Sequence, residues 1–545
     1  MPIKWKPIVA LIVLVAGTVL PFLGNTYLFD WDEVNFAECA REMLVSGDYL
    51  HPQIDFEPFW EKPPFFFWLQ AASMHLFGVN EFAARFPNAI VGLATIVLLA
   101  LVGRRWLDGT FGLLWAMVWV GSLLPNFYMH TGLIDPLFNL LMFAAIVAAY
   151  ESIESQRRWI LISTSGILIG LAVLTKGPVA IVLVGVPFLV LWWKHFGWMK
   201  IATDVLIIGV LSLLPFGLWL LSDQSAYGQW FTRSFAEYQL RLLTTQDAGH
   251  GGPFYYHILV LLLGCFPASW LALSTLRKTG RIESLANQTL LMATLLGVVI
   301  VVFSIVKTKI VHYSSLAYYP ITFFAAQVLY RWWMNPHRAW WLNTLITGAI
   351  ILSGVMIATP LVLSNKQLLL SLVHDQFARS IIETARPHWK GIEWSAGALL
   401  LSAAIVALFL HKRMPRPAFI VLTVGIALSI SAFLRVVAPR IGDFTQRELV
   451  EFCRRYSNRD VILHPIGFKT YVHLFYGKRR PEQSPRAYGI ERSRWESFLL
   501  SGRVDRDVVF IAKRAKALDL LRRPDLVQLD DPQSAWLFLL RPRTK

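Results

Sequence analysis

Long apolar segments are the feature that most limits how this chain can fold. A helix that crosses a membrane needs about 20 apolar residues, and rarely fewer than ~17. Hydrophobic residues make up 55% of the chain and charged residues only 16%, against about 25% charged residues in soluble proteins. Thirteen segments come close to the required length, at 7–27, 86–103, 111–128, 133–150, 159–174, 178–193, 201–221, 255–273, 288–305, 314–331, 339–362, 394–410 and 417–434. The sequence therefore predicts an α-helical polytopic membrane protein with about 13 transmembrane helices.

The exact number of spans depends on short segments. Several have 16 to 18 residues, so closely spaced pairs such as 159–174 and 178–193 leave the count open. If the N-terminus is cytoplasmic, every second connection is short and basic, as expected for cytoplasmic loops. These loops hold Arg104, Arg105, Arg157, Arg158, Lys194, Lys200, Arg277, Lys278, Arg281, Arg331, Arg338, Lys412, Arg413 and Arg416. We therefore expect a cytoplasmic N-terminus and an external C-terminal segment.

The composition changes at about residue 440. This last segment has 22 basic and 13 acidic residues, a net charge of +9, and no further apolar span. The runs "DVILHPI", "TYVHLFYG", "DVVFIAKRA" and "AWLFLLRP" favour strands, and "TQRELVEFCRRY" favours a helix. We expect a transmembrane domain over 1–439 and a small α/β extracytoplasmic domain over 440–545. Together with the basic loops, this segment accounts for the net charge of +16, so the charge does not indicate nucleic-acid binding.

The first external loop, 24–85, has a pattern of its own. Two helices are predicted in it, "DEVNFAECAREMLVSG" and "PPFFFWLQAASMHLFG", and we expect both to lie at the membrane interface. Asp32 is suited to cap the first helix, and Gly47 to end it. Pro63 and Pro64 suit the opening turn of the second. The three cysteines, Cys39, Cys265 and Cys453, are too scattered for a metal or redox motif, and we expect structural thiols.

Acids and cations collect in the external loops. Each has a plain structural alternative, such as a helix cap, a snorkelling lysine or a surface ion pair. Cations at a membrane surface can hold a lipid phosphate, and a carboxylate can take a proton from an attacking hydroxyl. The pattern therefore favours group transfer from a lipid-linked phosphate. The residues are Asp32, Glu33, Glu61, Lys62, Asp135, Lys176, Arg241, His250, Lys309, His312 and Tyr313.

Several motifs resemble those of GT-C glycosyltransferases that use polyprenyl-phosphate sugars. They are "DEVNFAECAREMLVSGDYLHPQI", "FEPFWEKPP", "FGVNEFAARFPNAI", "LTKGP", "GGPFYYHILVLLLGCFP" and "KTKIVHYSSLAYYP", in that order. The pattern is similar to the bacterial aminoarabinose transferases that modify lipid A, within the wider protein-mannosyltransferase-like superfamily. It covers roughly residues 7–335. It implies a GT-C membrane domain with 13 spans and an external C-terminal domain in a bacterial inner membrane.

The resemblance also implies roles for individual residues. Asp32 matches the family's critical acid and Glu33 completes the pair, with Asp135 as a further catalytic candidate. Glu61 matches a carboxylate linked to a divalent metal. The donor's lipid phosphate would be bound by Lys62, Arg241, Lys176, Lys309 and Tyr313. Where the aminoarabinose transferases have Glu-His, this chain has Glu237-Tyr238, so either a metal ligand is missing or His250 replaces it.

The resemblance implies an inverting sugar transferase that acts on a lipid, glycan or protein acceptor at the outer face of the membrane. Two other classes remain open from the sequence. A transporter or flippase for a lipid-linked sugar would need polar access from both membrane faces, whereas the inner loops are merely short and basic. A non-catalytic membrane assembly or sensor protein would tolerate substitution of the acids.

Overall fold

The computed structural model describes residues 5–245, 251–276, 282–336, 340–529 and 534–544. Every predicted span overlaps a helix or a pair of helices. Seven helices in the described part of the chain are long and apolar enough to cross a membrane, so a multi-pass membrane protein is confirmed and the count of 13 stays a prediction. The spans correspond to α1 (Trp5–Val19), α4 (Glu81–Trp106), α5 (Gly109–Val120) with α6 (Leu123–Tyr128), α7 (Asp135–Glu151), α8 (Arg158–Lys176), α9 (Val179–His195), α10 (Trp198–Tyr227), α12 (Tyr256–Gly264) with α13 (Ala268–Leu273), α14 (Ala286–Ile305), α15 (Tyr318–Met334), α16 (Trp340–Ser364), α19 (Ser395–Leu410) and α20 (Pro415–Val436).

Two predicted spans are broken, and the breaks touch each other. The first lies between α5 and α6 and the second at Pro267, whose ring removes a backbone donor. The Leu123 N–H donates to the Phe266 carbonyl at 3.0 Å. An N–H group at the start of α6 and a carbonyl that follows α12, neither of which has a partner within its own helix, thereby satisfy each other. Short 3-10 helices complete the helical region: η1 (Leu20–Phe22), η3 (Ser274–Leu276), η5 (Glu283–Leu285) and η6 (Val311–Ala317).

The first external loop contains the two predicted helices, α2 (Asp32–Ser46) and α3 (Phe65–Phe77), with a hairpin of β1 (Gln53–Ile54) and β2 (Glu57–Pro58) between them. Gly47 ends α2 at φ 74°, as predicted. The cap prediction for Asp32 was wrong, because Asp32 is the first helical residue and makes no capping bond. The interfacial prediction for α2 was also wrong, because all its residues from Glu33 to Met43 are buried.

The C-terminal segment forms helices and a four-stranded sheet of order β3-β4-β6-β5. Strand β3 pairs parallel with β4, and β6 is antiparallel to both β4 and β5. The strand prediction for "TYVHLFYG" was wrong, because Val472–Phe475 form the short helix α23, and all residues from Thr470 to Tyr476 are buried. The elements are α21 (Ala438–Asp443), α22 (Arg447–Tyr456), β3 (Val461–Ile466), α23 (Val472–Phe475), η7 (Pro481–Gln483), η8 (Pro485–Tyr488), α24 (Arg492–Ser501), β4 (Asp507–Lys513), η9 (Arg514–Lys516), η10 (Leu518–Arg522), β5 (Val527–Gln528) and β6 (Trp536–Arg541).

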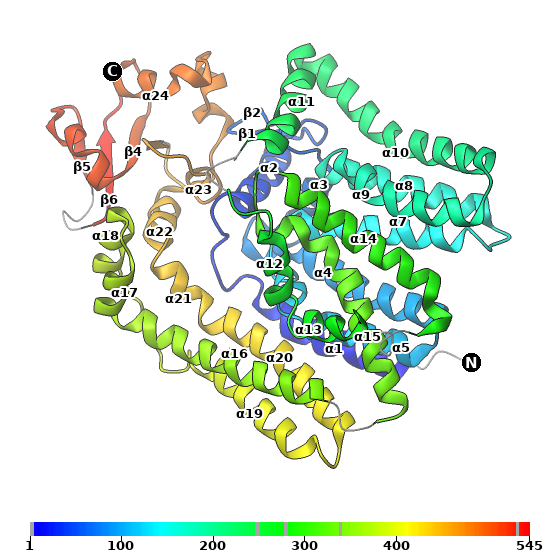
Figure 1. Ribbon diagram of the computed structural model, residues 1–545. Coiled ribbons are helices and arrows are strands. Elements are labelled where there is room, and N and C mark those ends of the chain that lie inside the picture. Colours follow the sequence, from blue (N-terminus) through cyan, green and yellow to red (C-terminus); the bar gives the residue numbers. More distant parts are fainter. Residues whose placement is uncertain (1–4, 246–250, 277–281, 337–339, 530–533, 545) are drawn as a thin grey trace.

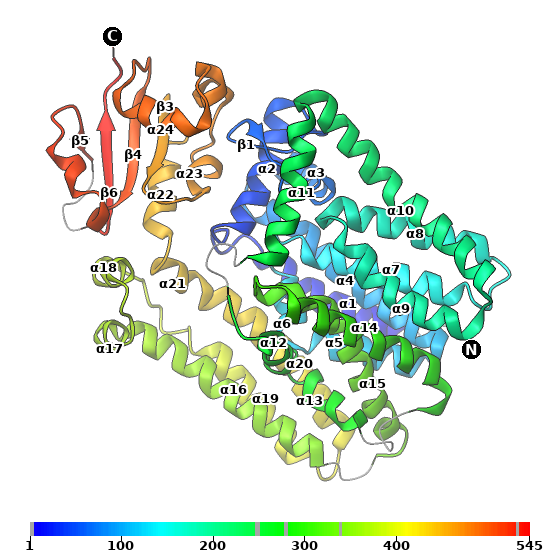
Figure 2. The same ribbon diagram turned by 45° about the horizontal axis from the view of Figure 1, so that its top comes forward.

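This segment is packed onto the first external loop. Figures 1 and 2 show α22 and α23 between the sheet and α2. The Leu28 N–H donates to the Tyr476 hydroxyl at 2.8 Å, and Arg479 forms a buried ion pair with Asp55 at 2.9 Å. The main hydrophobic core runs from the helical bundle into α22 and α23, while the far side of the sheet has a core of its own. The division at residue 439/440 stays a prediction.

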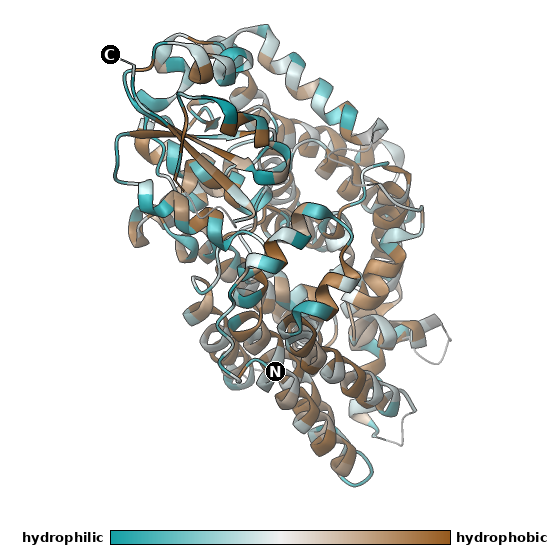
Figure 3. Ribbon diagram, turned by 90° about the vertical axis from the view of Figure 1, so that its left-hand side faces the viewer, coloured by the Kyte–Doolittle hydropathy of each residue, from teal (hydrophilic) through white to brown (hydrophobic). Residues whose placement is uncertain are grey.

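Three surface helices complete the fold. Helix α11 (Gln229–Thr244) follows α10 and lies over the loop 24–85. Helices α17 (Lys366–Leu372) and α18 (Gln376–Thr384) reach the sheet, where Phe377 contacts Trp536. Figure 3 shows the hydropathy of these parts: the bundle helices are mainly apolar, and polar residues gather on the C-terminal segment. Polar chemistry is therefore concentrated at one end of the bundle. All three cysteines are buried free thiols, as predicted.

Candidate active site

Four polar residues from separate elements meet at this end of the bundle. Asp32 begins α2, Asp135 begins α7, Lys176 ends α8 and His312 lies in η6. Lys176 forms an ion pair with Asp135. The His312 Nε2 atom is 3.7 Å from a carboxylate oxygen of both Asp32 and Asp135. We call these four residues the acid cluster.

Asp32 is the accessible carboxylate of the acid cluster. Its side chain is 46% exposed, whereas that of Asp135 is 4% exposed. No hydrogen bond from a described residue reaches the Asp32 carboxylate, and 3.7 Å to His312 is too long for one. Burial lowers the pKa of His312, which keeps its imidazole neutral near pH 7. Asp32 is therefore free to accept a proton from a substrate, while Asp135 is neutralised by Lys176.

The residue before Asp32 is held in an unusual conformation. Trp31 has φ 75°, which costs a non-glycine residue about 1–3 kcal/mol. The C-terminal segment holds it there: Tyr471 contacts its ring edge-on with centroids 6.2 Å apart, and the Lys469 ammonium lies 5.2 Å from the ring. Thr470 also donates to Asp30 at 2.9 Å. Residues 469–471 thus fix the backbone from which Asp32 projects.

A second group of residues, which we call the cation cluster, brings Lys62 and Arg241 to one tyrosine. Lys62 follows the β1–β2 hairpin, and its ammonium donates to the Tyr238 hydroxyl at 3.2 Å. The Lys62 ammonium lies 4.8 Å from the centre of the Tyr238 ring, and the Arg241 guanidinium carbon lies 5.2 Å from it. Cations are attracted to the face of an aromatic ring. Tyr238 therefore holds the positive charges of Lys62 and Arg241 next to each other beside α11, in an arrangement suited to an anionic group.

Tyr313 connects the two clusters. The Lys176 ammonium lies 4.6 Å from its ring centre. Burial raises the pKa of the Tyr313 phenol, Lys62 opposes this shift, and Asp135 and Asp32 add to it. Tyr313 therefore lies within electrostatic range of charged residues from both clusters.

Glu33 has a structural role that differs from the catalytic role predicted for it. Its carboxylate is 2% exposed and accepts two bonds from Arg85, at 3.0 and 2.8 Å. It also accepts bonds from the backbone N–H groups of Phe29 and Gly132. With its acceptor positions occupied, Glu33 anchors the start of α2 to α4 and does not face a substrate.

Lys309 and His250 do not join the two clusters either. Lys309 was predicted to bind the donor phosphate, but its ammonium donates to the carbonyls of Phe303, Ser304 and Val306. These bonds satisfy the C-terminal end of α14, so Lys309 acts as a helix cap. His250 lies outside the described residues.

The described residues do not fit a divalent metal at Glu61. No group of three His, Cys, Asp or Glu side chains in this part of the chain could hold a metal ion. Glu61 lines a cavity of about 410 Å³ together with Lys469, Tyr471 and Arg492. Two cations beside a carboxylate oppose metal binding, and Glu237 pairs with Arg233 on the exposed face of α11. We derive no chemical step through a metal.

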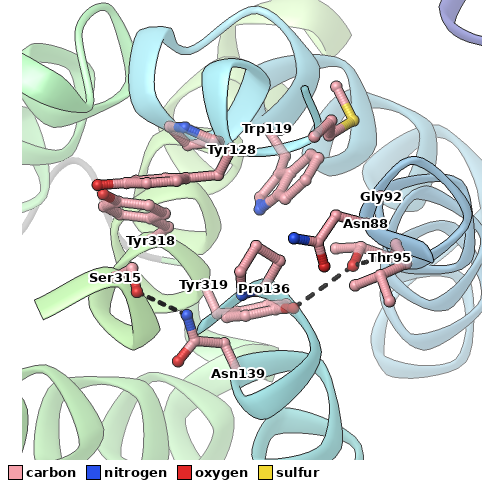
Figure 4. Close-up of a pocket in the computed structure, with 13 residues that line it drawn as sticks. Asn88, Gly92, Thr95, Trp119, Tyr128, Pro136, Asn139, Ser315, Tyr318 and Tyr319 are labelled. Atoms are coloured by element: carbon pink, nitrogen blue, oxygen red, sulfur yellow. Dashed lines mark hydrogen bonds between the residues drawn. The ribbon is translucent and has the colours of Figure 1, made fainter. Parts of the chain in front are cut away.

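A small enclosed pocket lies beneath the acid cluster, next to Pro136 (Figure 4). Tyr128 and Tyr318 stack across it with ring centroids 6.2 Å apart, and Asn139 donates to Ser315 at 2.7 Å. Its volume of about 20 Å³ suffices for about one water molecule. The pocket is too small for a sugar ring, so the substrates have to bind above it.

Several residues of the site went unrecognised in the sequence. Arg85, Tyr238 and Lys469 each hold another residue of the site in place, and such support has no motif of its own. For Arg85 there was a usable signal, because an arginine near the start of an apolar span needs a buried partner. Tyr238 stood out only as a departure from the Glu-His pattern.

Comparisons with known proteins show which sequences and which fold the chain resembles. The sequence profile of the dolichyl-phosphate-mannose-protein mannosyltransferase family matches residues 61–219. The undecaprenyl phosphate-alpha-4-amino-4-deoxy-L-arabinose arabinosyl transferase of Enterobacter sp. (strain 638) is 27% identical over 64% of this chain and 65% of its own length. Transferase 2 of the same name from Proteus mirabilis is 29% identical over 46% of each chain. These alignments span about half to two thirds of the relatives.

The structural similarity extends further along the chain. The crystal structure of ArnT from Cupriavidus metallidurans bound to undecaprenyl phosphate superposes with a TM-score of 0.80 over 99% of this chain and 98% of that one, at 17% identity. The apo structure of the same protein gives a TM-score of 0.74. The chain is therefore similar in part of its sequence to aminoarabinose transferases and to the mannosyltransferase family, and it shares the fold of ArnT along nearly its whole length.

Proposed function

We propose that the protein is a membrane glycosyltransferase that moves a sugar from a polyprenyl-phosphate donor to an acceptor. The observation that carries this proposal is Asp32: a half-exposed carboxylate without a hydrogen bond from a described residue, 3.7 Å from a buried histidine. Lys62 on the first loop and Arg241 on the neighbouring α11 contact the same tyrosine ring, and two cations so placed suit a donor phosphate. The names of the sequence relatives support undecaprenyl phosphate as the lipid and an amino sugar as the transferred group.

The reaction is an inverting displacement. An acceptor oxygen attacks the anomeric carbon, and the bond between that carbon and the phosphate oxygen breaks. Lys62 and Arg241 offset the charge that develops on the departing phosphate, which therefore needs no acid. If the acceptor is a hydroxyl, its proton passes to Asp32. If the acceptor is itself a phosphate, no proton needs to be removed and Asp32 orients it.

The acceptor enters from the side of the C-terminal segment. The cavity that contains Glu61 is lined on one side by the first loop and on the other by Lys469, Tyr471 and Arg492. Tyr471 in its wall contacts Trp31, which precedes Asp32, and Glu61 in its wall directly precedes Lys62, so an acceptor there would lie next to both clusters. Two cations in this cavity favour an acceptor that carries a negative charge, whether lipid, glycan or protein.

The membrane topology follows from the charge pattern. The N-terminus lies in the cytoplasm, thirteen spans cross the bacterial inner membrane, and the two clusters with the C-terminal segment face the outer side. The basic connections between helices, at the opposite end of the bundle from the acid cluster, support this orientation.

Transfer by the purified protein tests the proposal. The protein in liposomes is incubated with a panel of polyprenyl-phosphate sugars and acceptors, and products are identified by mass spectrometry. We expect one donor to support transfer by the wild type and none by D32N or K62A. Transport of the lipid-linked sugar across the liposome without transfer would favour a flippase. Full function in cells carrying D32N would favour a non-catalytic assembly role.

A further inference from the structure

A second polar cavity lies on the other side of α2, away from both clusters. It has a volume of about 590 Å³, and its charged lining residues are all basic: Arg41, Lys478, Arg479 and Arg480. The last three belong to the "GKRR" turn that follows α23, and Arg41 lies on α2. The two halves of the cavity thus come from the first loop and from the C-terminal segment, which lie side by side in Figure 2.

Arg479 is the most informative residue of this cavity. It is 3% exposed, and its guanidinium donates to Asp55 at 2.9 Å and to the Leu463 carbonyl at 3.3 Å. The Nη2 nitrogen is buried and has no hydrogen-bond partner among the described residues. A buried donor without a partner is destabilising, and such groups in native structures usually point to an unseen acceptor.

Lys478 and Arg480 supply charge that the protein does not balance. Both are exposed, and neither forms an ion pair with a described residue; the Arg480 guanidinium donates to the Arg459 carbonyl at 3.1 Å. Arg41, by contrast, is paired with Glu38 at 2.7 Å. An anion in the cavity would accept charge-assisted bonds from Lys478, from Arg480 and from the Nη2 nitrogen of Arg479.

The remaining wall of the cavity is apolar. Val45 and Val79 line it and are 47% and 36% exposed. At the end of α3, close to Val79 in sequence, Leu76 is 73% and Phe77 44% exposed. Exposed apolar side chains on a membrane protein are suited to contact with lipid. The cavity therefore combines a site for an anion with a surface for an apolar body.

We propose that this cavity binds the phosphate group of an anionic lipid, at a site separate from the donor site. Arg41 lies nine residues after Asp32 on α2, about 13 Å along the helix axis. The phosphate accepts bonds from Arg479 Nη2, Lys478 and Arg480, and the lipid tails lie against Val45, Val79 and the end of α3. Since the three donors belong to the C-terminal segment and Val45 belongs to α2, the bound lipid links the two. The proposal does not depend on the sugar-transfer reaction.

The test is lipid binding by the full-length protein in neutral detergent. Thermal unfolding is followed by tryptophan fluorescence at constant ionic strength, with three additives: phosphatidylglycerol, phosphatidylcholine and inorganic phosphate. The test variant is K478A/R480A, which removes two exposed charges without disturbing a buried ion pair. The matched control is R503A/R522A, which removes two exposed arginines of the same segment outside the cavity.

We expect phosphatidylglycerol, but not phosphatidylcholine, to stabilise the wild type and the control. The apparent affinity of K478A/R480A for phosphatidylglycerol should be weaker by at least about tenfold, because its charge-assisted bonds are lost. Stabilisation by inorganic phosphate at the same concentration as the lipid would show that the ligand is free phosphate and not a lipid headgroup. Equal stabilisation of K478A/R480A and wild type, or equal effects of both lipids, would overturn the proposal.

Discussion

The acid cluster and the cation cluster are held in place in opposite ways. Asp135, Lys176 and His312 are 4–13% exposed, and an ion pair joins Lys176 to Asp135 at two helix ends. Lys62, Tyr238 and Arg241 lie on a loop and a surface helix and are joined by one hydrogen bond and two cation–ring contacts. The acid cluster is therefore buried apart from the half-exposed Asp32, and the cation cluster lies at the surface of the protein.

This difference matches two different chemical tasks. A group that accepts a proton has to be held within hydrogen-bond reach of one atom, which requires a rigid support. A site for a lipid phosphate has to admit and release a large anion. Cations on a loop and a surface helix allow this. We therefore expect substitutions in the acid cluster to reduce kcat, and substitutions in the cation cluster to raise the donor KM.

The largest effect is expected for D32N. Loss of the carboxylate should lower kcat by about 10²–10⁴-fold for a hydroxyl acceptor, and leave the donor KM unchanged. Initial rates at varied donor concentration give both constants. D519N is the matched control, because Asp519 is 92% exposed on the C-terminal segment and lies outside both clusters. Equal losses in D32N and D519N would argue against a specific role for Asp32.

Glu33 and its partner should respond as structural residues. R85A leaves a buried carboxylate without its partner, which should cost about 3–5 kcal/mol of stability. R105A, in which a 67% exposed arginine is removed, should change stability by less than about 1 kcal/mol. Thermal unfolding in detergent compares the two. A fully stable but inactive R85A would show that this pair has a catalytic role after all.

Tyr238 allows the cation cluster to be taken apart in two steps. Y238F keeps the ring and loses the hydroxyl that accepts from Lys62, so the donor KM should rise about threefold. Y238A loses the ring as well, and the donor KM should rise about 30-fold. In both variants kcat should stay close to that of the wild type. A lower kcat at unchanged KM would place Tyr238 with the acid cluster.

A smaller effect is expected from His312 as the pH is lowered. Burial holds its pKa below the ordinary value of 6.5, so the unfolded chain binds this proton at higher pH than the folded one. Stability is therefore lost as the pH falls from 6.5 through the folded-state pKa, and is unaffected by this residue above 6.5. H312Q should show a flatter fall of the melting temperature over that interval. Identical pH profiles would remove His312 from the account.

Chelation of divalent metals should have no effect. Glu61 lies beside Lys469 and Arg492, and no described group of ligands accompanies it. Transfer rates with and without a chelator, followed by addition of zinc or magnesium, check this. A rate that is lost on chelation and restored by a metal would return Glu61, with His250, to the role that the resemblance implies.

The sequence predicted the membrane helices and the two loop helices, because apolar length, glycine and proline are strong local signals. It could not separate Asp32 from Glu33. Successive residues on a helix point about 100° apart, and only the packed structure shows that Glu33 faces Arg85 while Asp32 faces the site. Lys309 was misassigned because a lysine near a helix end can either bind a ligand or cap the helix, and the sequence does not distinguish the two roles.

The contribution of the C-terminal segment was the least predictable. "TYVHLFYG" is rich in residues that favour strands, yet its central residues form the helical turn α23, which packs against α2 and α22. Lys469, Tyr471 and Arg492 are brought to the site by long-range packing, more than 400 residues after Asp32. No local pattern carries such information.

Binding of polyprenyl phosphate to D32N and K62A tests the central claim most directly, because it separates donor binding from proton transfer. The dissociation constant of the lipid phosphate is measured for the wild type and both variants under the same conditions. The account predicts wild-type affinity for D32N and an affinity about tenfold weaker for K62A. Weak binding by D32N together with wild-type binding by K62A would contradict it.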